Sequence, residues 1–310
     1  MILHANARWP DVKPCLSVLV PFLGDDPSPL LQALEAEKGD HTNRVEIIIL
    51  DDGTNDPSLT RKLQDLVDTS HHAICLLSSP NNLGRSKGRN LLAAQARGSN
   101  LLFIDADMLP DHPDFLRFWL AHIDTQSPAA SFGGFSVIQA SSAPEYAVHR
   151  SMALRSDCLP ASIRSQHPEK HVFTSNLLIR RDVFLKNSFD EDFQGWGWED
   201  VEWAMRVTNA HTITHIDNTA THLGLDTVPA LMSKYRQSAA NFARIAHLHP
   251  EYVARYPSYR IAKILRVLNL ATLVRMTAKP VAAASFLPAS IRGIALRFYR
   301  AALYAKALGT

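Results

Sequence analysis

Short apolar runs alternate with amphipathic segments along the first half of the chain. The runs are rich in Val, Ile and Leu and too short for buried helices, so they predict buried strands. The predicted strands cover residues 16–22, 45–50, 73–77 and 101–104, and the predicted helices between them cover 29–38, 59–67 and 88–96. This alternation predicts a mostly parallel sheet with helices on both faces, an architecture typical of nucleotide-binding proteins.

The pattern becomes less regular after residue 110 and changes again near residue 229. Strands are predicted at 132–138, 173–179 and 212–217, helices at 115–123, 144–157 and 198–208, and a mobile loop or an ordinary surface loop at 156–170. From residue 229 onward only helices are predicted, at 228–247, 259–279 and 290–308. The pattern therefore predicts an α/β part over residues 1–228 and a helical extension over 229–310.

Composition adds few constraints. The 310 residues are 46% hydrophobic and 20% charged, as in an ordinary globular protein. The three cysteines lie far apart without CxxC spacing, which indicates neither a disulfide framework nor a zinc site and favours a reducing cytoplasm. Neither a signal peptide nor a spanning segment is predicted.

The net charge of +2 conceals an asymmetry. Residues 252–310 contain ten Lys or Arg and no Asp or Glu, which leaves a net charge of −8 for the rest of the chain. An apolar stripe of Ile261, Ile264, Leu265 and Leu268 lies among these cations. Basic amphipathic helices bind anionic membrane surfaces, so we expect a cytoplasmic protein that can be peripheral on the inner face of the membrane. The alternative is packing on the α/β part or in a homodimer; no nucleic-acid-binding motif accompanies the charge.

The chemistry is expected at the carboxyl edge of the sheet. The apolar run ending at Ile104 leads directly into Asp105 and Asp107. Side chains two residues apart in extended chain project to the same side, so both carboxylates can share one divalent cation, Mg²⁺ or Mn²⁺. A polar loop without a ligand is the alternative.

Two further segments belong to the same edge. Asp52 follows the strand 45–50, where its carboxylate can accept from a uracil N–H or a ribose hydroxyl; an ordinary Asp-Gly turn is the alternative. The loop 82–90 carries Arg85, Lys87 and Arg89 before a helix, and cations at a helix N-terminus attract a diphosphate. A solvated basic turn is the alternative there.

A second acidic cluster lies in the segment Gly195-Trp-Gly-Trp-Glu-Asp200. The predicted helix 198–208 places Asp200 in its first turn, where the helix dipole favours the ionised form that a general base needs. The glycines leave room for a sugar, and Trp196 and Trp198 offer flat apolar walls. An acidic helix start covered by local aromatic residues is the alternative.

Four of these segments together resemble the family 2 glycosyltransferases of the GT-A fold. They are residues 16–22 (LSVLVPF), 49–54 (ILDDGT), 81–90 (NNLGRSKGRN) and 103–107 (FIDAD). The resemblance implies a donor nucleotide site that is formed by Pro21, Phe22, Asp52, Asn82, Arg85, Arg89, Asp105 and Ala106. The segment GWGWED resembles the Trp-Gly-x-Glu-Asp acceptor motif of galactosyl- and N-acetylgalactosaminyltransferases. It implies that Asp200 is the general base and that Trp196, Gly197, Trp198 and Glu199 bind the acceptor.

His222 lies in a segment, Thr219-Ala-Thr-His222, that resembles the one supplying this group with a histidine metal ligand. The implied metal set is Asp105, Asp107 and His222, and the imidazole favours Mn²⁺ over Mg²⁺. The resemblance thus implies an inverting transferase that moves a hexose or N-acetylhexosamine from a UDP-sugar to a glycan or lipid-linked saccharide, in polysaccharide or glycolipid biosynthesis. A sugar-phosphate nucleotidyltransferase and a non-catalytic nucleotide-sugar-binding scaffold are the alternatives.

Overall fold

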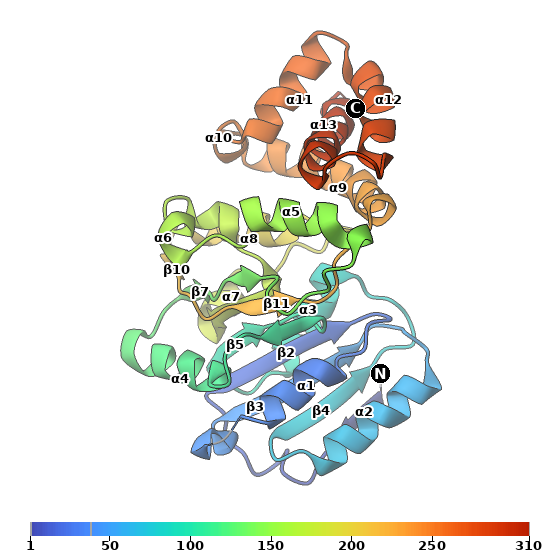
Figure 1. Ribbon diagram of the computed structural model, residues 1–310. Coiled ribbons are helices and arrows are strands. Elements are labelled where there is room, and N and C mark those ends of the chain that lie inside the picture. Colours follow the sequence, from blue (N-terminus) through green and yellow to red (C-terminus); the bar gives the residue numbers. More distant parts are fainter. Residues whose placement is uncertain (1, 38, 310) are drawn as a thin grey trace.

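The computed structural model describes residues 2–37 and 39–309 (Figure 1). Met1, Lys38 and Thr310 lie outside the described residues, so the last residue of the predicted helix 29–38 and the outer bounds of the two predicted parts cannot be compared. Within the described ranges the strands form an eight-stranded sheet of order β1-β4-β3-β2-β5-β9-β7-β10 and a three-stranded sheet of order β6-β11-β8.

The large sheet has a parallel centre. β2 pairs in parallel with both β3 and β5, whereas β9 runs antiparallel between β5 and β7. The strands are β1 Ile2–Ala5, β2 Leu16–Phe22, β3 Val45–Asp51, β4 Ala73–Ser78, β5 Asn100–Phe103, β6 Met108–Pro110, β7 Ala130–Phe132, β8 Phe135–Ser136, β9 Leu177–Arg180, β10 Ile213–His215 and β11 Ala220–His222. The predicted mixed α/β class is confirmed.

Helices cover both faces of this sheet (Figure 1). Leu30, Leu63 and Trp119, from α1, α2 and α4, share one core with β2, whereas Leu92 and Trp203, from α3 and α8, belong to the core on the opposite face. The helices of the α/β part are α1 Ser28–Glu35, α2 Pro57–Thr69, α3 Arg85–Gln95, α4 Phe115–Gln126, α5 Ala147–Ser156, α6 Ala161–Arg164, α7 Arg181–Lys186 and α8 Glu199–Val207. Short 3₁₀-helices occupy Asp40–Asn43, Pro144–Tyr146, Pro168–His171 and Thr174–Asn176.

Several predicted elements differ from the structure. The predicted strand 132–138 is interrupted at Gly133 and Gly134, where a Cβ on Gly133 would lie 2.5 Å from Asn176 and where Gly134 has φ +104°. The predicted strand 173–179 begins only at Leu177. The predicted loop 156–170 contains α6 and a 3₁₀-helix, and its Arg164 is buried. Strands β1, β6 and β11 have no counterpart among the predictions.

The chain after β11 is helical and stacks on α5 and α8 (Figure 1). Its helices are α9 Val228–Leu248, α10 Pro250–Val253, α11 Pro257–Val267, α12 Ala271–Ala283 and α13 Ala289–Ala307. One apolar core joins Val201 and Met205 of α8 to Phe242 of α9 and Tyr304 of α13. The predicted helix 259–279 is divided into α11 and α12 at Asn269, which has φ +52°. No helix in the described residues is both long and apolar enough to cross a bilayer.

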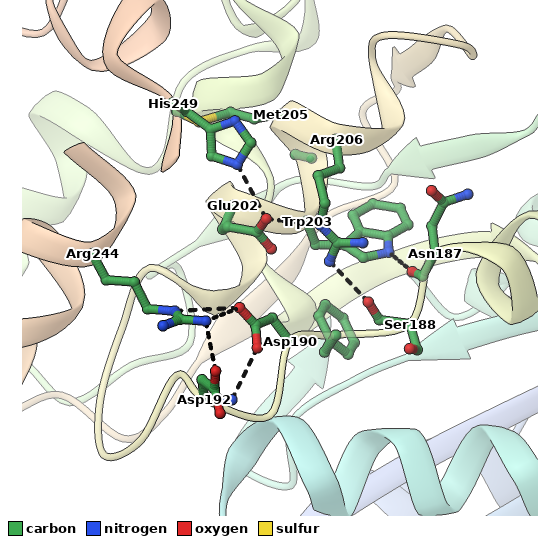
Figure 2. Close-up of polar contacts among 12 residues, drawn as sticks. Asn187, Ser188, Asp190, Asp192, Glu202, Trp203, Met205, Arg206, Arg244 and His249 are labelled. Carbon is green, nitrogen blue, oxygen red and sulfur yellow. Dashed lines mark hydrogen bonds and ion pairs between the residues drawn. The ribbon is translucent and has the colours of Figure 1, made fainter. Parts of the chain in front are cut away.

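Polar contacts also fasten α9 to the α/β part (Figure 2). Arg244 forms ion pairs of 2.8 Å with Asp190 and Asp192, in the loop that leads to GWGWED. Glu202 of α8, which is buried, accepts from Arg206 at 2.7 Å and is 3.1 Å from His249 at the end of α9. The helical extension is therefore tied to the acidic segment of the α/β part by both apolar and charged contacts.

Candidate active site

The central parallel strands deliver the predicted donor residues to one edge of the sheet. Phe22 ends β2 opposite Asp51 of β3, and Asp105 follows β5. Phe22 and Ala106 are buried at this edge, and Pro21 is half-buried. The geometry follows from parallel strands ending at one edge.

Asp107 and His222 meet at this edge. β11 pairs antiparallel with β6, and His222 lies opposite Met108, next to Asp107. The His222 Nε2 atom is 3.0 Å from Asp107 Oδ2. Burial raises the pKa of Asp107, but the hydrogen bond and the charge of His222 outweigh burial and hold that pKa below its usual value. Gly224 permits this arrangement, because a Cβ there would lie 2.1 Å from Asp107 Oδ2.

Asp105, the third predicted ligand, is held elsewhere. Arg89 Nη2 donates to Asp105 Oδ1 at 2.5 Å, and Arg89 is itself buried. Within the described ranges, no three His, Cys, Asp or Glu side chains lie close enough together to hold a metal ion. The structure thus brings together two of the three predicted ligands.

The Asp107 and His222 pair nevertheless suits a divalent cation. A carboxylate oxygen and an imidazole nitrogen are both donors that Mn²⁺ accepts in proteins. Their 3.0 Å contact is a hydrogen bond, and the buried Nδ1 atom of His222 has no hydrogen-bond partner among the described residues. These two residues could therefore bind a divalent cation, which would keep further coordination sites for oxygen ligands.

Asp52 shapes the loop before α3. Its Oδ1 accepts from Leu83 N at 2.7 Å and its Oδ2 from Gly84 N at 3.1 Å, while Asn82 Oδ1 also accepts from Gly84 N. Burial raises the pKa of Asp52, although these two backbone hydrogen bonds oppose the rise. Any contact with a nucleobase must use the remaining lone pairs of the carboxylate. Gly84 has φ +87°, which lets the loop turn into the helix.

The predicted basic loop is helical from Arg85 onward, because α3 begins three residues earlier than the sequence pattern predicts. Arg85 donates through Nε to Glu199, and Arg89 Nη1 donates to the Arg85 carbonyl at 3.4 Å. The chain of contacts therefore runs from Asp105 through Arg89 and Arg85 to Glu199. It connects the two acidic clusters, which are almost a hundred residues apart in sequence.

Asp200 lies beside this chain of ion pairs. Burial and the neighbouring Glu199 charge raise the pKa of Asp200 to about 7, although Arg85 opposes the rise. The pKa of Glu199 is lowered: the charges of Arg85 and Arg89 and the Arg85 hydrogen bond outweigh the opposing effect of burial. Two adjacent carboxylates are thereby given different protonation behaviour, as in sites that separate a base from a structural charge.

The two tryptophans have different surroundings. Trp198 donates through its indole N–H to Tyr304 at 3.1 Å and stacks on Tyr256, so it belongs to the core of the helical extension. Trp196 lies against Tyr235 and has the Lys234 ammonium 5.9 Å from its ring centroid. Gly197 has φ +90°, and its carbonyl accepts from Asn241 at 2.9 Å. The expectation of two free aromatic walls thus fits Trp196 better than Trp198.

A set of charged residues around Asp107 was not predicted from the sequence. Lys234 Nζ is 2.6 Å from Asp226 Oδ2, and the Asp226 N–H donates to His149 Nδ1 at 2.7 Å. Asp25, in the loop after β2, has a raised pKa because of desolvation and the charges of Asp107 and Asp105. Asp25 follows a strand end, which was a usable signal, but Lys234 lies mid-helix with no local pattern to single it out.

Two surface depressions in the described part of the chain lie elsewhere. One, of about 420 Å³, is lined by Asn55, Asp56, Pro57, Thr60 and Arg61. The other, of about 440 Å³, is lined by residues including Ser188, Glu202, Arg206 and His249 (Figure 2). Neither contains a predicted site residue, so the chemistry of the sheet edge, rather than cavity size, defines the candidate site.

The parallel sheet, the Asp-x-Asp segment at its carboxyl edge and the second acidic pair beside it together define a GT-A glycosyltransferase. The model of the family described as "Glycosyl transferase family 2" matches residues 17–187, which is more than half of the chain. The chain belongs to this family, which confirms the predicted family and enzyme class. A comparison with curated proteins finds no match.

Solved structures agree on the fold. The mannosyltransferase PcManGT from Pyrobaculum calidifontis, in complex with GDP-Man and Mn²⁺, is 16% identical with a TM-score of 0.60, over 94% of this chain and 87% of that one. S. aureus TarS 1-349 in complex with UDP is 16% identical with a TM-score of 0.52, over 95% of this chain and 90% of that one. GalNAc-T7 with UDP, GalNAc and Mn²⁺ is 16% identical with a TM-score of 0.52, over 73% of this chain and 47% of that one.

Proposed function

We propose that this glycosyltransferase moves a hexose or N-acetylhexosamine from a UDP-sugar to a saccharide or lipid-linked saccharide, with inversion and with Mn²⁺ as the metal. The observation that carries the proposal is the continuous chain of contacts from Asp105 through Arg89 and Arg85 to Glu199. It makes the donor edge and the acidic acceptor segment one site. Similar solved structures are complexes with GDP-Man, UDP or UDP-GlcNAc.

Asp107 and His222 are the residues that would hold the metal, with Asp105 joining them if Arg89 releases its carboxylate. A divalent cation there would neutralise negative charge on the diphosphate and act as a Lewis acid for the leaving nucleotide. A neutral imidazole in the ligand set favours Mn²⁺, with Mg²⁺ as the alternative. Arg89 Nη2 would then need another acceptor in place of Asp105, which a diphosphate oxygen could supply.

Lys234 of α9 supplies a further cation near Asp107. Its charge acts on Asp107 and Asp25, and Asp226 holds its ammonium. We assign it to the diphosphate, where it would stabilise the charge that develops as the nucleotide leaves. Asp52 would keep the loop of Leu83 and Gly84 in the form that receives the nucleoside.

Asp200 would act as the general base. It takes the proton of an acceptor hydroxyl as that oxygen forms a bond to the anomeric carbon, and the bond from this carbon to the phosphate oxygen breaks on the opposite side. The electron pair of the broken bond stays on the β-phosphate of UDP, and an α-linked donor gives a β-linked product. A pKa near 7 keeps a substantial fraction of Asp200 ionised at neutral pH and still lets it hold the proton.

The decisive experiment is a donor panel with purified full-length chain. UDP or GDP release is followed for UDP-hexoses, UDP-N-acetylhexosamines and GDP-mannose with saccharide acceptors, with Mn²⁺, with Mg²⁺ and with a chelator. We expect acceptor-dependent UDP release that needs the metal. Pyrophosphate release from a nucleoside triphosphate and a sugar phosphate would indicate a nucleotidyltransferase instead, and donor binding without turnover would indicate a scaffold.

A further inference from the structure

The helix α12 is apolar on its outer face as well as on its inner face. Ala271, Ala278 and Ala282 are buried against the rest of the helical extension. Leu273 and Met276, about half a turn away around the helix, are 57% and 66% exposed. Arg275 and Lys279 lie between these two faces, so α12 is an amphipathic helix with a second apolar face that is exposed. Large exposed apolar side chains that lie together mark an interaction surface.

The exposed apolar residues continue past both ends of α12. Val267 and Leu268 precede it, Val281 lies in its last turn, and Phe286 in the following loop is 86% exposed. We call the six residues Val267, Leu268, Leu273, Met276, Val281 and Phe286 the outer apolar surface. It belongs to the end of the molecule formed by α11, α12 and α13 (Figure 1).

Cations that form no ion pair with any described residue accompany this surface. Lys263, Lys279 and Arg297, one each from α11, α12 and α13, are exposed. Among the described residues, no Lys or Arg between positions 252 and 309 forms an ion pair with a carboxylate. The same segment contains no Asp or Glu at all, and the charge of Asp157 in the α/β part, which acts on Arg297 and Arg300, compensates its positive field only in part.

We infer that the outer apolar surface docks on an anionic lipid bilayer. A bilayer offers apolar chains to Leu273, Met276 and Phe286 and anionic headgroups to the flanking cations. A twofold contact between two copies of this surface would place like charges against each other, because such a contact repeats one patch on both subunits. The inference is independent of the donor and the reaction proposed above.

Docking would also bring the acceptor segment to the membrane. Asn241 of α9 donates to the Gln194 and Gly197 carbonyls, and α9 packs against α13. The helical extension therefore holds the GWGWED segment directly. An acceptor carried on a lipid would then meet the enzyme at the surface where that lipid resides, a consequence that does rest on the proposed function.

The test uses full-length protein and sedimentation with vesicles of phosphatidylcholine alone or with phosphatidylglycerol. We expect binding to the anionic vesicles that weakens with salt, and little binding to the neutral ones. Replacing Lys263, Lys279 and Arg297 by Gln should lower partitioning about 100-fold, since each cation contributes about a factor of five. The double variant Leu273→Gln/Met276→Gln should lower it about tenfold or more.

A matched control replaces three exposed cations of the α/β part, Arg61, Lys170 and Lys186, by Gln. Partitioning should then stay near the wild-type value. All substituted side chains are exposed, and thermal unfolding of each variant verifies that it is folded. The inference is overturned if the folded wild-type chain does not bind anionic vesicles. It is also overturned if the control lowers binding as much as the replacement of Lys263, Lys279 and Arg297. It is also overturned if light scattering shows a dimer that Leu273→Gln/Met276→Gln dissociates without any effect of lipid.

Discussion

The donor edge and the acceptor segment of the candidate site are built in different ways. At the donor edge, Asp52 and Asp105 follow the buried strands β3 and β5, which flank β2, and are placed by the sheet itself. The acceptor segment is a loop with positive φ at Gly195, Gly197 and Trp198. Helices from the last quarter of the chain hold it, through contacts such as the one from Trp198 to Tyr304.

This difference separates two kinds of dependence. The donor edge relies mainly on strand ends, and Lys234 is the residue of the helical extension that we assign to it, so it is expected to tolerate changes elsewhere in that extension. The acceptor segment relies on long-range contacts, so perturbing Asn241 of α9 or perturbing α13 should affect acceptor use before donor binding. The ion pair from Arg85 to Glu199 is where the two parts meet.

The largest effect should come from Asp200→Asn. Loss of the base should lower kcat by about 10²–10⁴-fold, while UDP affinity, which belongs to the donor edge, stays within about twofold. The raised folded pKa means that ionising Asp200 costs folding free energy, a cost absent below the unfolded value near 3.8 and complete above pH 7. The variant should therefore unfold at a slightly higher temperature than wild type at pH 8. Unchanged turnover would remove Asp200 from the mechanism.

His222→Ala tests the donor edge directly. Without the imidazole next to Asp107, the Mn²⁺ concentration for half-maximal activity should rise by about tenfold or more, at least what losing an outer-shell partner costs. Acceptor KM at saturating metal should change little. The neighbouring His149→Gln serves as a comparison, since His149 bonds to the Asp226 N–H rather than to Asp107. An unaltered metal titration in His222→Ala would refute its assignment as a ligand.

The pH dependence of kcat should report the ionisation of Asp200, whereas UDP binding should not depend on it. Because the pKa of Asp200 is about 7 and the base must be ionised, kcat should fall as pH decreases through 7, by about tenfold at pH 6. UDP binding measured by calorimetry should not share this inflection. Glu199→Gln removes the like charge that raises the pKa, so it should move the inflection to lower pH. An inflection that persists in Asp200→Asn with residual activity would belong to another group.

The same contrast explains how much the sequence alone could predict. Strands β2 to β5 and the family were correctly predicted, because alternating apolar runs and strand-end carboxylates are local signals. Arg85 was expected as a free cation, but its partner Glu199 lies 114 residues away and no local pattern reveals it. The packing of Trp198 was missed for the same reason, since Tyr256 and Tyr304 contact it only after the helical extension has folded back.

Asn241→Ala should change acceptor use but not donor use, with a smaller effect than the variants above. The variant loses two hydrogen bonds to the Gln194 and Gly197 carbonyls, each contributing about 1 kcal/mol. We expect acceptor KM to rise about five- to tenfold with donor KM unchanged. Asn187→Ala is a suitable comparison, because its side chain donates to Val183 O outside this segment. Equal changes in both KM values would indicate that the two parts are not separable.

The smallest kinetic effect is expected from changing the contacts of Glu202 with Arg206 and His249 in Figure 2. Glu202 is buried and accepts from Arg206 and His249, so Glu202→Gln leaves two donors with a weaker, neutral partner. The free energy of unfolding should fall by about 1–3 kcal/mol, as for buried hydrogen bonds to charged groups. UDP affinity should not change. Asp182→Asn, which weakens the exposed pair with Arg180, should cost less than about 1 kcal/mol. If Glu202→Gln is no more destabilising than this control, the contact does not fasten the helical extension, and the acceptor segment depends on its apolar packing alone.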